Sequence, residues 1–331
     1  MSRWARNMWL VLTPALLVSV ALLGCSGDKD KKRGGGDGKK DGNGKKDDGK
    51  DGDQDGKLEP VKVGGGTISG TITLKKGVEP DYEELKAELK KKIDKNTNRN
   101  ACKEAYEQKA WLVDKSSRGV KNVAVWLMPE NDSQFFDAKE LAEKKKGKAF
   151  DPVVVLDQPH CNFEPRVVVL FPAYIDPSKP KTEDGDPNYV PTGQKFYAVN
   201  PVAIKHNTKL IVPRGGGKSD GRVVPESTKA NPEKGLDLTA ISDLHPYDLS
   251  KGPIHIACDI HDWMSGSAWA RPHPLAAVTD DKGKFEIKNV PDTGKVRIFV
   301  WHEGAGFITP KNGKVIDAKD GKQDFTIEDV K

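Results

Sequence analysis

The chain has 331 residues and a formal net charge of +5, from 54 Lys and Arg against 49 Asp and Glu. The first 60 or so residues have an unusual composition. About 270 residues follow them, enough for one large domain or two small ones. The sequence contains no Gly-rich phosphate loop, no G-x-S-x-G or H-E-x-x-H motif, and no pairing of acidic residues that would suggest a glycosidase. We therefore predict that the protein is not an enzyme.

Residues 1–25 follow the plan of a bacterial export signal. Arg3 and Arg6 form a basic region, and the apolar run from Leu10 to Leu23 is shorter than the roughly 20 residues that span a bilayer. Cys25 stands at the expected cut site, and this ending resembles the lipobox of bacterial lipoproteins. By that resemblance Cys25 would carry lipid that anchors the protein to a cell-envelope membrane, facing the periplasm or the cell exterior. Ordinary secretion with cleavage near the same place is the alternative.

Residues 26–60 are predicted to form a disordered tether. Between Ser26 and Lys57 the chain is almost only Gly, Lys and Asp, with ten Lys or Arg against nine Asp. Such a segment has no apolar residues to offset the entropy of ordering, and its r.m.s. reach is roughly 30 Å. Because the charges nearly cancel, the segment does not have the composition of a nucleic-acid-binding tail.

The rest of the sequence predicts a mostly β fold. Leu85, Leu89 and Ile93 lie four residues apart, which predicts a short amphipathic helix over 81–95, and a second helix is expected over 137–146. Both helices are expected to be surface additions. The D-D-K-G sequence at 280–283 predicts a hairpin. Alternating or continuous apolar runs predict strands at 67–74, 122–128, 153–157, 166–171, 267–272, 276–290, 295–303 and 324–330.

Segments at both ends of this region resemble one known family. TISGTITLKKG, VKNVAVWLMP, AVTDDKGKFEIKNVPDTGKVRIFVWHEG and DFTIED are similar, in that order, to the carboxypeptidase regulatory-like (prealbumin-like) β-sandwich. The first two segments precede residue 130 and the others follow residue 275, so we expect one sandwich split by an inserted second β unit. A single continuous sandwich is the alternative. The expected division is 61–150 and 272–331 for the split sandwich and 151–271 for the insertion.

A C-x-x-H-x-x-M pattern inside the expected insertion predicts a metal site. It is formed by Cys258, His261 and Met264 in the stretch HIACDIHDWMSG. A soft thiolate, an imidazole and a weak thioether suit copper better than zinc, calcium or magnesium. A trigonal copper site needs one more histidine, and His206, followed by Asn207, is the candidate. A buried thiol with nearby core histidine and methionine is the alternative.

This arrangement of residues resembles the cupredoxins, and the short loop is most similar to that of amicyanin- and plastocyanin-like blue copper proteins. The resemblance covers roughly 151–271 and implies a Greek-key β-sandwich of cupredoxin type, inserted into or packed beside the prealbumin-like one. It implies that His206, Cys258 and His261 are equatorial ligands of one type 1 copper ion and that Met264 is the axial ligand. Asn207 would tie the His206 strand to the cysteine loop by a hydrogen bond.

The neighbours of the expected ligands also have implied roles. Asp262 stands where amicyanin-like loops usually have proline, and a carboxylate beside His261 would favour the oxidised cation. By the resemblance, His261 would meet solvent through its ring edge, and Trp263 and Pro253 would line the docking surface for redox partners.

With Cys25 assigned to lipid and Cys258 to copper, Cys102 and Cys161 remain. An exported protein lies in a compartment that permits disulfides, so we predict a Cys102–Cys161 bridge.

The combined expectation is a membrane-tethered, extracytoplasmic carrier of single electrons between transient protein partners. One alternative is a non-redox envelope module that binds carbohydrate or protein, with a degenerate cupredoxin domain. Another is a copper-handling protein, which usually has Met- or His-rich tracts that this sequence lacks.

Overall fold

A computed structural model of the chain describes residues 58–102, 105, 109–143, 149–178, 187–213, 219–224, 226–227, 236–237 and 252–330. The expected export signal, lipidation at Cys25 and the tether up to residue 57 lie outside these residues. The described chain is mostly β and of sandwich type, which confirms the predicted fold class. Among its helices, none is both long and apolar enough to cross a membrane.

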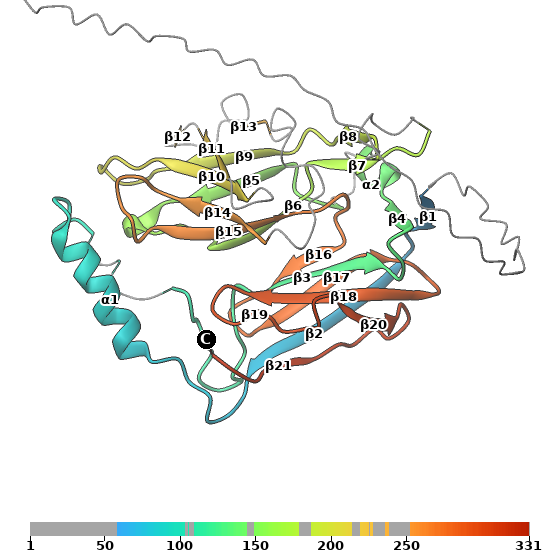
Figure 1. Ribbon diagram of the computed structural model, residues 1–331, viewed down its shortest axis with the longest axis horizontal. Helices are drawn as coiled ribbons and strands as arrows, with labels where there is room; N and C mark the ends of the chain where they lie inside the picture. Colours follow the sequence, from blue (N-terminus) through green and yellow to red (C-terminus); the bar gives the residue numbers. More distant parts are fainter. Residues whose placement is uncertain are drawn as a thin grey trace, which may run out of the picture. The chain divides into compact units, whose positions relative to one another are not determined.

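Strands from both ends of the described chain form one sandwich (Figure 1). Its eight strands are β2 (Gly66–Leu74), β3 (Ala124–Pro129), β16 (Ala276–Val278), β17 (Lys284–Val290), β18 (Lys295–His302), β19 (Gly306–Phe307), β20 (Lys314–Asp317) and β21 (Phe325–Ile327). One sheet has the order β17-β2-β21. The other has the order β16-β3-β18, with β20 and β19 pairing successive parts of the free side of β18. We call this unit the split sandwich.

Alternation along β2 explains how the split sandwich forms its core. Ile68, Ile72 and Leu74 are almost fully buried, and the threonines between them are more exposed. This period of two is the one that a strand with one face on a core requires. Gly70 lies on the same buried face. Only glycine fits there, because a Cβ would lie 1.8 Å from the carbonyl oxygen of Gln323.

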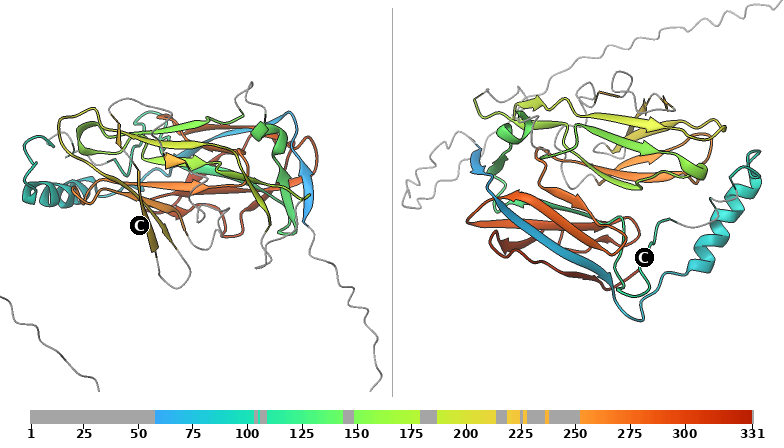
Figure 2. Two further views of the ribbon diagram at one scale, coloured as in Figure 1. Left: turned by 90° about the horizontal axis from the view of Figure 1, so that it is seen from above. Right: turned by 180° about the vertical axis from the view of Figure 1, so that it is seen from behind.

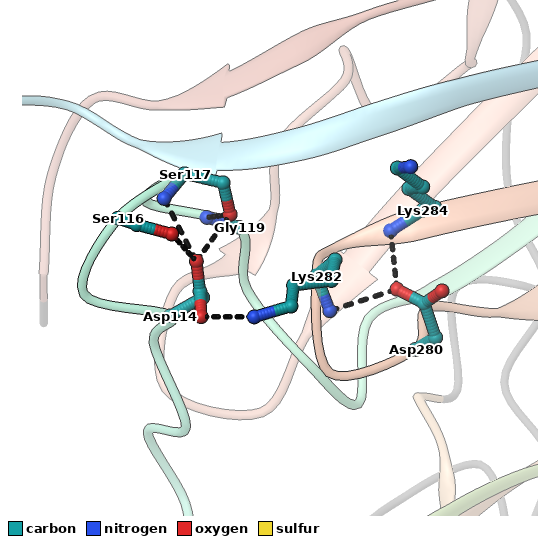
Figure 3. Close-up of polar contacts among 7 residues, drawn as sticks. All are labelled: Asp114, Ser116, Ser117, Gly119, Asp280, Lys282 and Lys284. Atoms are coloured by element: carbon teal, nitrogen blue, oxygen red, sulfur yellow. Dashed lines mark hydrogen bonds and ion pairs between the residues drawn. The ribbon is translucent and has the colours of Figure 1, made fainter.

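The turn at 280–283 does not form the predicted hairpin. The Asp280 carboxylate accepts hydrogen bonds from the backbone N–H groups of Lys282 and Lys284, each 2.8 Å long (Figure 3). Gly283 has a φ of +73°, as such a turn requires. However, β16 pairs with β3 and β17 pairs with β2, so the turn leads from one sheet to the other.

A second contact in Figure 3 fixes the position of this turn. The Lys282 ammonium lies 2.6 Å from the carboxylate of Asp114, which also accepts hydrogen bonds from Ser116 and Ser117. These hydrogen bonds hold the pKa of Asp114 well below its usual range, with the bond from Lys282 contributing most.

The second sandwich is formed by strands between residues 153 and 270, and we call it the inserted sandwich. Its nine strands are β5 (Val153–Asp157), β6 (Val167–Leu170), β9 (Lys195–Val199), β10 (Thr208–Pro213), β11 (Ser219–Val224), β12 (Glu226–Ser227), β13 (Leu236–Asp237), β14 (Ile254–Ala257) and β15 (Ser265–Ala270). One sheet has the order β11-β10-β14-β15-β6. In the other, β9 pairs with β5, β12 and β13. In the described residues, these strands pair only with one another.

Smaller elements flank the two sandwiches. They are the parallel pair β1 (Glu59–Lys62) and β4 (Gln134–Asp137), the antiparallel pair β7 (Ala173–Ile175) and β8 (Tyr189–Pro191), α2 (Lys139–Glu143), and a 3-10 turn at Pro159–Cys161. Helix α2 begins at Lys139, two residues later than the sequence predicts, and its Ala142 is buried in a small cluster with Phe171 and Tyr174.

Helix α1 (Tyr82–Lys95), labelled in Figure 1 and drawn again in Figure 2, is an exposed helix whose apolar side chains contact two cores. It begins after Asp81, whose carboxylate accepts a hydrogen bond from the N–H of Glu84 at 2.9 Å. Leu85 packs against the core of the split sandwich, whereas Leu89 and Ile93 pack against the core of the inserted sandwich. The predicted division at residue 150 therefore does not hold for the end of this helix and the segment after it.

Aromatic side chains join the two sandwiches. Trp126 and Phe299 of the split sandwich form one buried cluster with Trp269 and Val167 of the inserted sandwich. The rings of Trp126 and Phe299 are stacked with centroids 5.4 Å apart, and the rings of Trp126 and Trp269 lie 4.9 Å apart. Aromatic pairs at such spacings contribute beyond their buried area.

We predict that Ile93→Ala lowers the free energy of unfolding by about 2–5 kcal/mol, because the side chain is fully buried in the core of the inserted sandwich. Denaturant unfolding measures this change. Lys86→Ala, at an exposed position on the same helix, is the matched control and should have little effect. Equal effects of the two substitutions would contradict the role assigned to α1.

Candidate metal centre

Three neighbouring strands bring the predicted ligands to one end of a sheet. His206 comes shortly before β10, Cys258 directly follows β14, and Met264 directly precedes β15. Because β10 and β15 both run antiparallel to β14, the start of β10, the end of β14 and the start of β15 meet at the same edge. The pairing of Lys209 with Ala257 places the segment before β10 beside the loop that begins at Cys258.

The side chains of His206, Cys258 and His261 converge at this edge. The Nδ1 atoms of the two histidines lie 2.9 Å apart, and the Cys258 sulfur lies 3.8 Å from Nδ1 of His261. One donor atom from each residue lies within 4.8 Å of the others, so the three side chains can hold one metal ion. All three are buried, and Met264 is 1% exposed and belongs to the same core.

The ligand loop is clamped to the strand before it by Asn207. Its side-chain oxygen accepts a hydrogen bond from the backbone N–H of Asp259 at 2.7 Å, and its amide donates to the Asp259 carboxylate at 2.9 Å. Within the loop, the N–H of Met264 donates to the carbonyl of His261 at 2.9 Å. These contacts give Asn207 the position that the sequence resemblance implied.

Burial keeps the two histidines ready to bind a cation. It lowers the pKa of His206 to about 4, with a smaller contribution from His261, and it also lowers the pKa of His261. The charge of Asp262, an exposed residue, acts in the opposite direction on the pKa of His261. Both imidazoles are therefore neutral near pH 7, with a lone pair available on each ring.

A segment after α1, residues 96–102, covers the centre, and we call it the covering arm. The Asn98 amide lies 3.1 Å from Nε2 of His261, and the Asn96 amide donates to the carbonyl of Ile260 at 3.0 Å. Hydrogen bonds from Asn98 N–H to the Asn96 side chain, and from Cys102 N–H to the Asn98 carbonyl, hold the arm in shape. As a result, His261 is 0% exposed.

The covering arm is fastened by a disulfide between Cys102 and Cys161, the pair predicted from the sequence. The two sulfur atoms and a ring nitrogen of His261 lie within 4.8 Å of one another. The disulfide therefore lies directly beside a predicted ligand.

The structure corrects three expectations about the solvent-facing side of the centre. His261 does not present a ring edge to solvent, because Asn98 and the disulfide cover it. Trp263 is only 6% exposed and donates its indole N–H to the carbonyl of Cys161 at 3.1 Å, so it does not line a docking surface. Pro253 precedes β14 and Cys258 follows it, so they lie at opposite ends of that strand.

The spacing of the sulfur and nitrogen donor atoms suits the binding of one metal ion. Typical metal–sulfur and metal–nitrogen lengths of about 2.3 and 2.0 Å place such ligands about 3.7 Å apart at a trigonal angle, and the Cys258–His261 separation is 3.8 Å. The two Nδ1 atoms, 2.9 Å apart, are closer than a shared ion requires, so they would move apart by about half an ångström.

Asn98 is the neighbour that the sequence did not reveal. Its side-chain amide nitrogen lies 3.1 Å from Nε2 of His261, on the opposite side of the ring from Nδ1, the atom that faces His206 and Cys258. The Asx turn from Asn96 to Asn98 was the only local signal, and it gives no hint of a contact with residue 261.

Comparisons with protein-family models, curated proteins and solved structures found no match to this chain.

We predict that diethyl pyrocarbonate modifies the exposed His255 of the oxidised, metal-free protein but spares His261. Reducing the Cys102–Cys161 bridge should make His261 reactive, because the bridge holds the covering arm over it. Peptide mass spectrometry distinguishes the two sites. Modification of His261 as fast as His255 before reduction would show that the arm does not cover the centre.

Proposed function

We propose that the protein is a type 1 copper protein that carries single electrons between partner proteins outside the cytoplasm. The observation that carries this proposal is the convergence of His206, Cys258 and His261 at one sheet edge, with Met264 buried beside them. A thiolate with two imidazoles and a weak thioether is the donor set of blue-copper electron-transfer sites.

The four side chains would bind the ion through donor groups of different kinds. Cys258 would bind as a thiolate, His206 and His261 through Nδ1, and Met264 as a weak thioether ligand. Bound copper would supply a Cu(II)/Cu(I) couple. The full set of protein ligands leaves no position for a substrate, which favours electron carriage over bond-making.

Rigid support from the protein favours the same role. The Asn207–Asp259 contacts fix one side of the ligand loop, and Asn98 contacts His261 on the other. A ligand frame that does not rearrange lets an ion change charge with little reorganisation of its surroundings.

The expected location agrees with this function. The Cys102–Cys161 disulfide suits a compartment that permits disulfides, as expected for an exported protein. We propose that lipid on Cys25 anchors the chain to the cell-envelope membrane. The tether would then let the described unit move between membrane-attached donors and acceptors.

A cleft beside the ligand loop is the proposed docking surface for these partners. It has a volume of about 640 Å³ and lies between the end of α1 and the loop, with Lys91, Lys95, Asp262 and Ile260 in its lining. Ile260 is 41% exposed, and its carbonyl accepts the hydrogen bond from Asn96. A small contact of mixed charge with one apolar residue suits the transient encounters of redox proteins.

One observation favours a second function, the storage or delivery of copper. His261 is fully covered, and a covered ligand would slow electron entry while retaining the ion. The two functions differ in one property: a carrier exchanges electrons quickly with a small redox reagent, whereas a storage protein does not.

We predict that the full chain with copper(II), after removal of excess metal, shows an intense band near ~600 nm and one copper per chain. Cys258→Ser should abolish the band because it removes the thiolate. The Cys102→Ser/Cys161→Ser double variant is the matched control and should keep it, because these sulfurs form the disulfide.

A colourless protein that retains no copper would overturn the proposal. Stopped-flow reduction by a small outer-sphere reagent then separates the two functions for a blue protein. Slow exchange with tightly held copper would favour storage.

A further inference from the structure

A buried arginine at the junction of the two sandwiches has no counter-charge. Arg271 is 1% exposed, follows β15, and forms no ion pair with any carboxylate among the described residues. Its side chain donates one hydrogen bond among the described residues, from Nη1 to the carbonyl of Ala270 at 2.7 Å, and its Nε and Nη2 atoms have no partner there. Because removing a charge from water is costly, such a group normally has a partner of opposite sign.

Aromatic rings offset only part of that cost. The guanidinium carbon lies 4.4 Å from the ring centroid of Trp126 and 4.9 Å from that of Trp269. Cation–π contacts stabilise a desolvated cation, but they do not satisfy its N–H groups. Burial also lowers the pKa of Arg271 to about 9, which leaves it charged at neutral pH.

The polar atoms left unpaired near Arg271 are all donors. His273 is fully buried, and its Nδ1 accepts a hydrogen bond from the N–H of Leu275 at 3.2 Å. Burial and the charge of Arg271 lower the pKa of His273 to about 3, so its ring is neutral and carries its proton on Nε2, which has no partner. The indole N–H groups of Trp126 and Trp269 are also buried and unpaired.

A water molecule complements such a group poorly, because it brings two O–H donors that need acceptors of their own. An anion accepts from every direction and also neutralises the guanidinium. One positive charge calls for a single negative charge, and only a small ion suits a site where Arg271 and His273 are each 1% exposed.

We propose that Arg271 and His273 bind a small inorganic monoanion of the size of chloride between the two sandwiches. Nε and Nη2 of Arg271 and Nε2 of His273 are the donors that hold it. A cavity of about 520 Å³ has His273, Pro274 and Lys121 in its lining, so it lies beside one of the two residues. The site is separate from the metal centre and its existence does not depend on copper.

Thermal unfolding of the full chain tests the site. Sodium gluconate is replaced stepwise by sodium chloride at constant ionic strength, so that only a specific ion effect remains. The Tm should rise along a saturation curve, by roughly 5 °C at one hundred times the dissociation constant. A response that is linear in chloride, or absent, would overturn the proposal.

Arg271→Met removes the charge while keeping a long apolar side chain and should abolish the saturable rise. Arg297→Met is the matched control, because Arg297 is also largely buried but is paired with Asp132 at 2.6 Å. This variant should keep the chloride response whatever its own Tm. Equal responses of the two variants would place the effect elsewhere.

Diffraction from crystals of the unaltered chain in sodium bromide locates the ion without any substitution. An anomalous bromide peak within hydrogen-bond distance of Nε or Nη2 of Arg271 and Nε2 of His273 is the expected result. Ordered water at that position, with no halide, would overturn the proposal.

Discussion

The antiparallel ladder β10–β14–β15 is the constraint on which the metal centre depends. Lys209 pairs with Ala257, and Ala257 pairs with Ser265, so the segments that carry His206, Cys258 and Met264 end at the same height in the sheet. A shift of one residue in either pairing would reverse the faces of a whole strand. The Asn207–Asp259 hydrogen bonds join the first and second of these segments just beyond the last paired residues, where the ladder itself no longer holds them.

The two sandwiches are linked by more than their shared chain. The split sandwich supplies Trp126 to the junction. The segment between β2 and β3, which contains α1, contacts the split sandwich through Leu85 and also reaches the other sandwich. That segment fills the core of the inserted sandwich with Ile93, covers His261 with Asn98, and is fixed by the Cys102–Cys161 bond. The centre is therefore built from both parts of the chain, although its donor atoms all come from one.

The sequence predicted what is encoded locally. Period-two alternation placed the strand at 67–74, and the short spacing from Cys258 to Met264 marked the loop, since neighbours in sequence must remain neighbours in space. It could not reveal that Asn98 contacts a residue 163 positions away, because no periodic pattern records such a contact. Turn chemistry failed at 280–283 for a related reason: Asp and Gly favour the same tight turn whether the strands pair or diverge into two sheets.

Because the chain is synthesised from its N-terminus, the two halves of the split sandwich become available for folding at different times. β2 and β3 leave the ribosome long before their partners β16, β17 and β18, which follow the complete inserted sandwich. Until then β2 and β3 lack these neighbouring strands, and Cys102 lacks its disulfide partner Cys161. Because domains generally fold as units from the N-terminus onward, the inserted sandwich can complete its ladders first. It can then serve as the surface on which the two halves of the other sandwich meet, with the Trp126–Trp269 contact as the point of assembly.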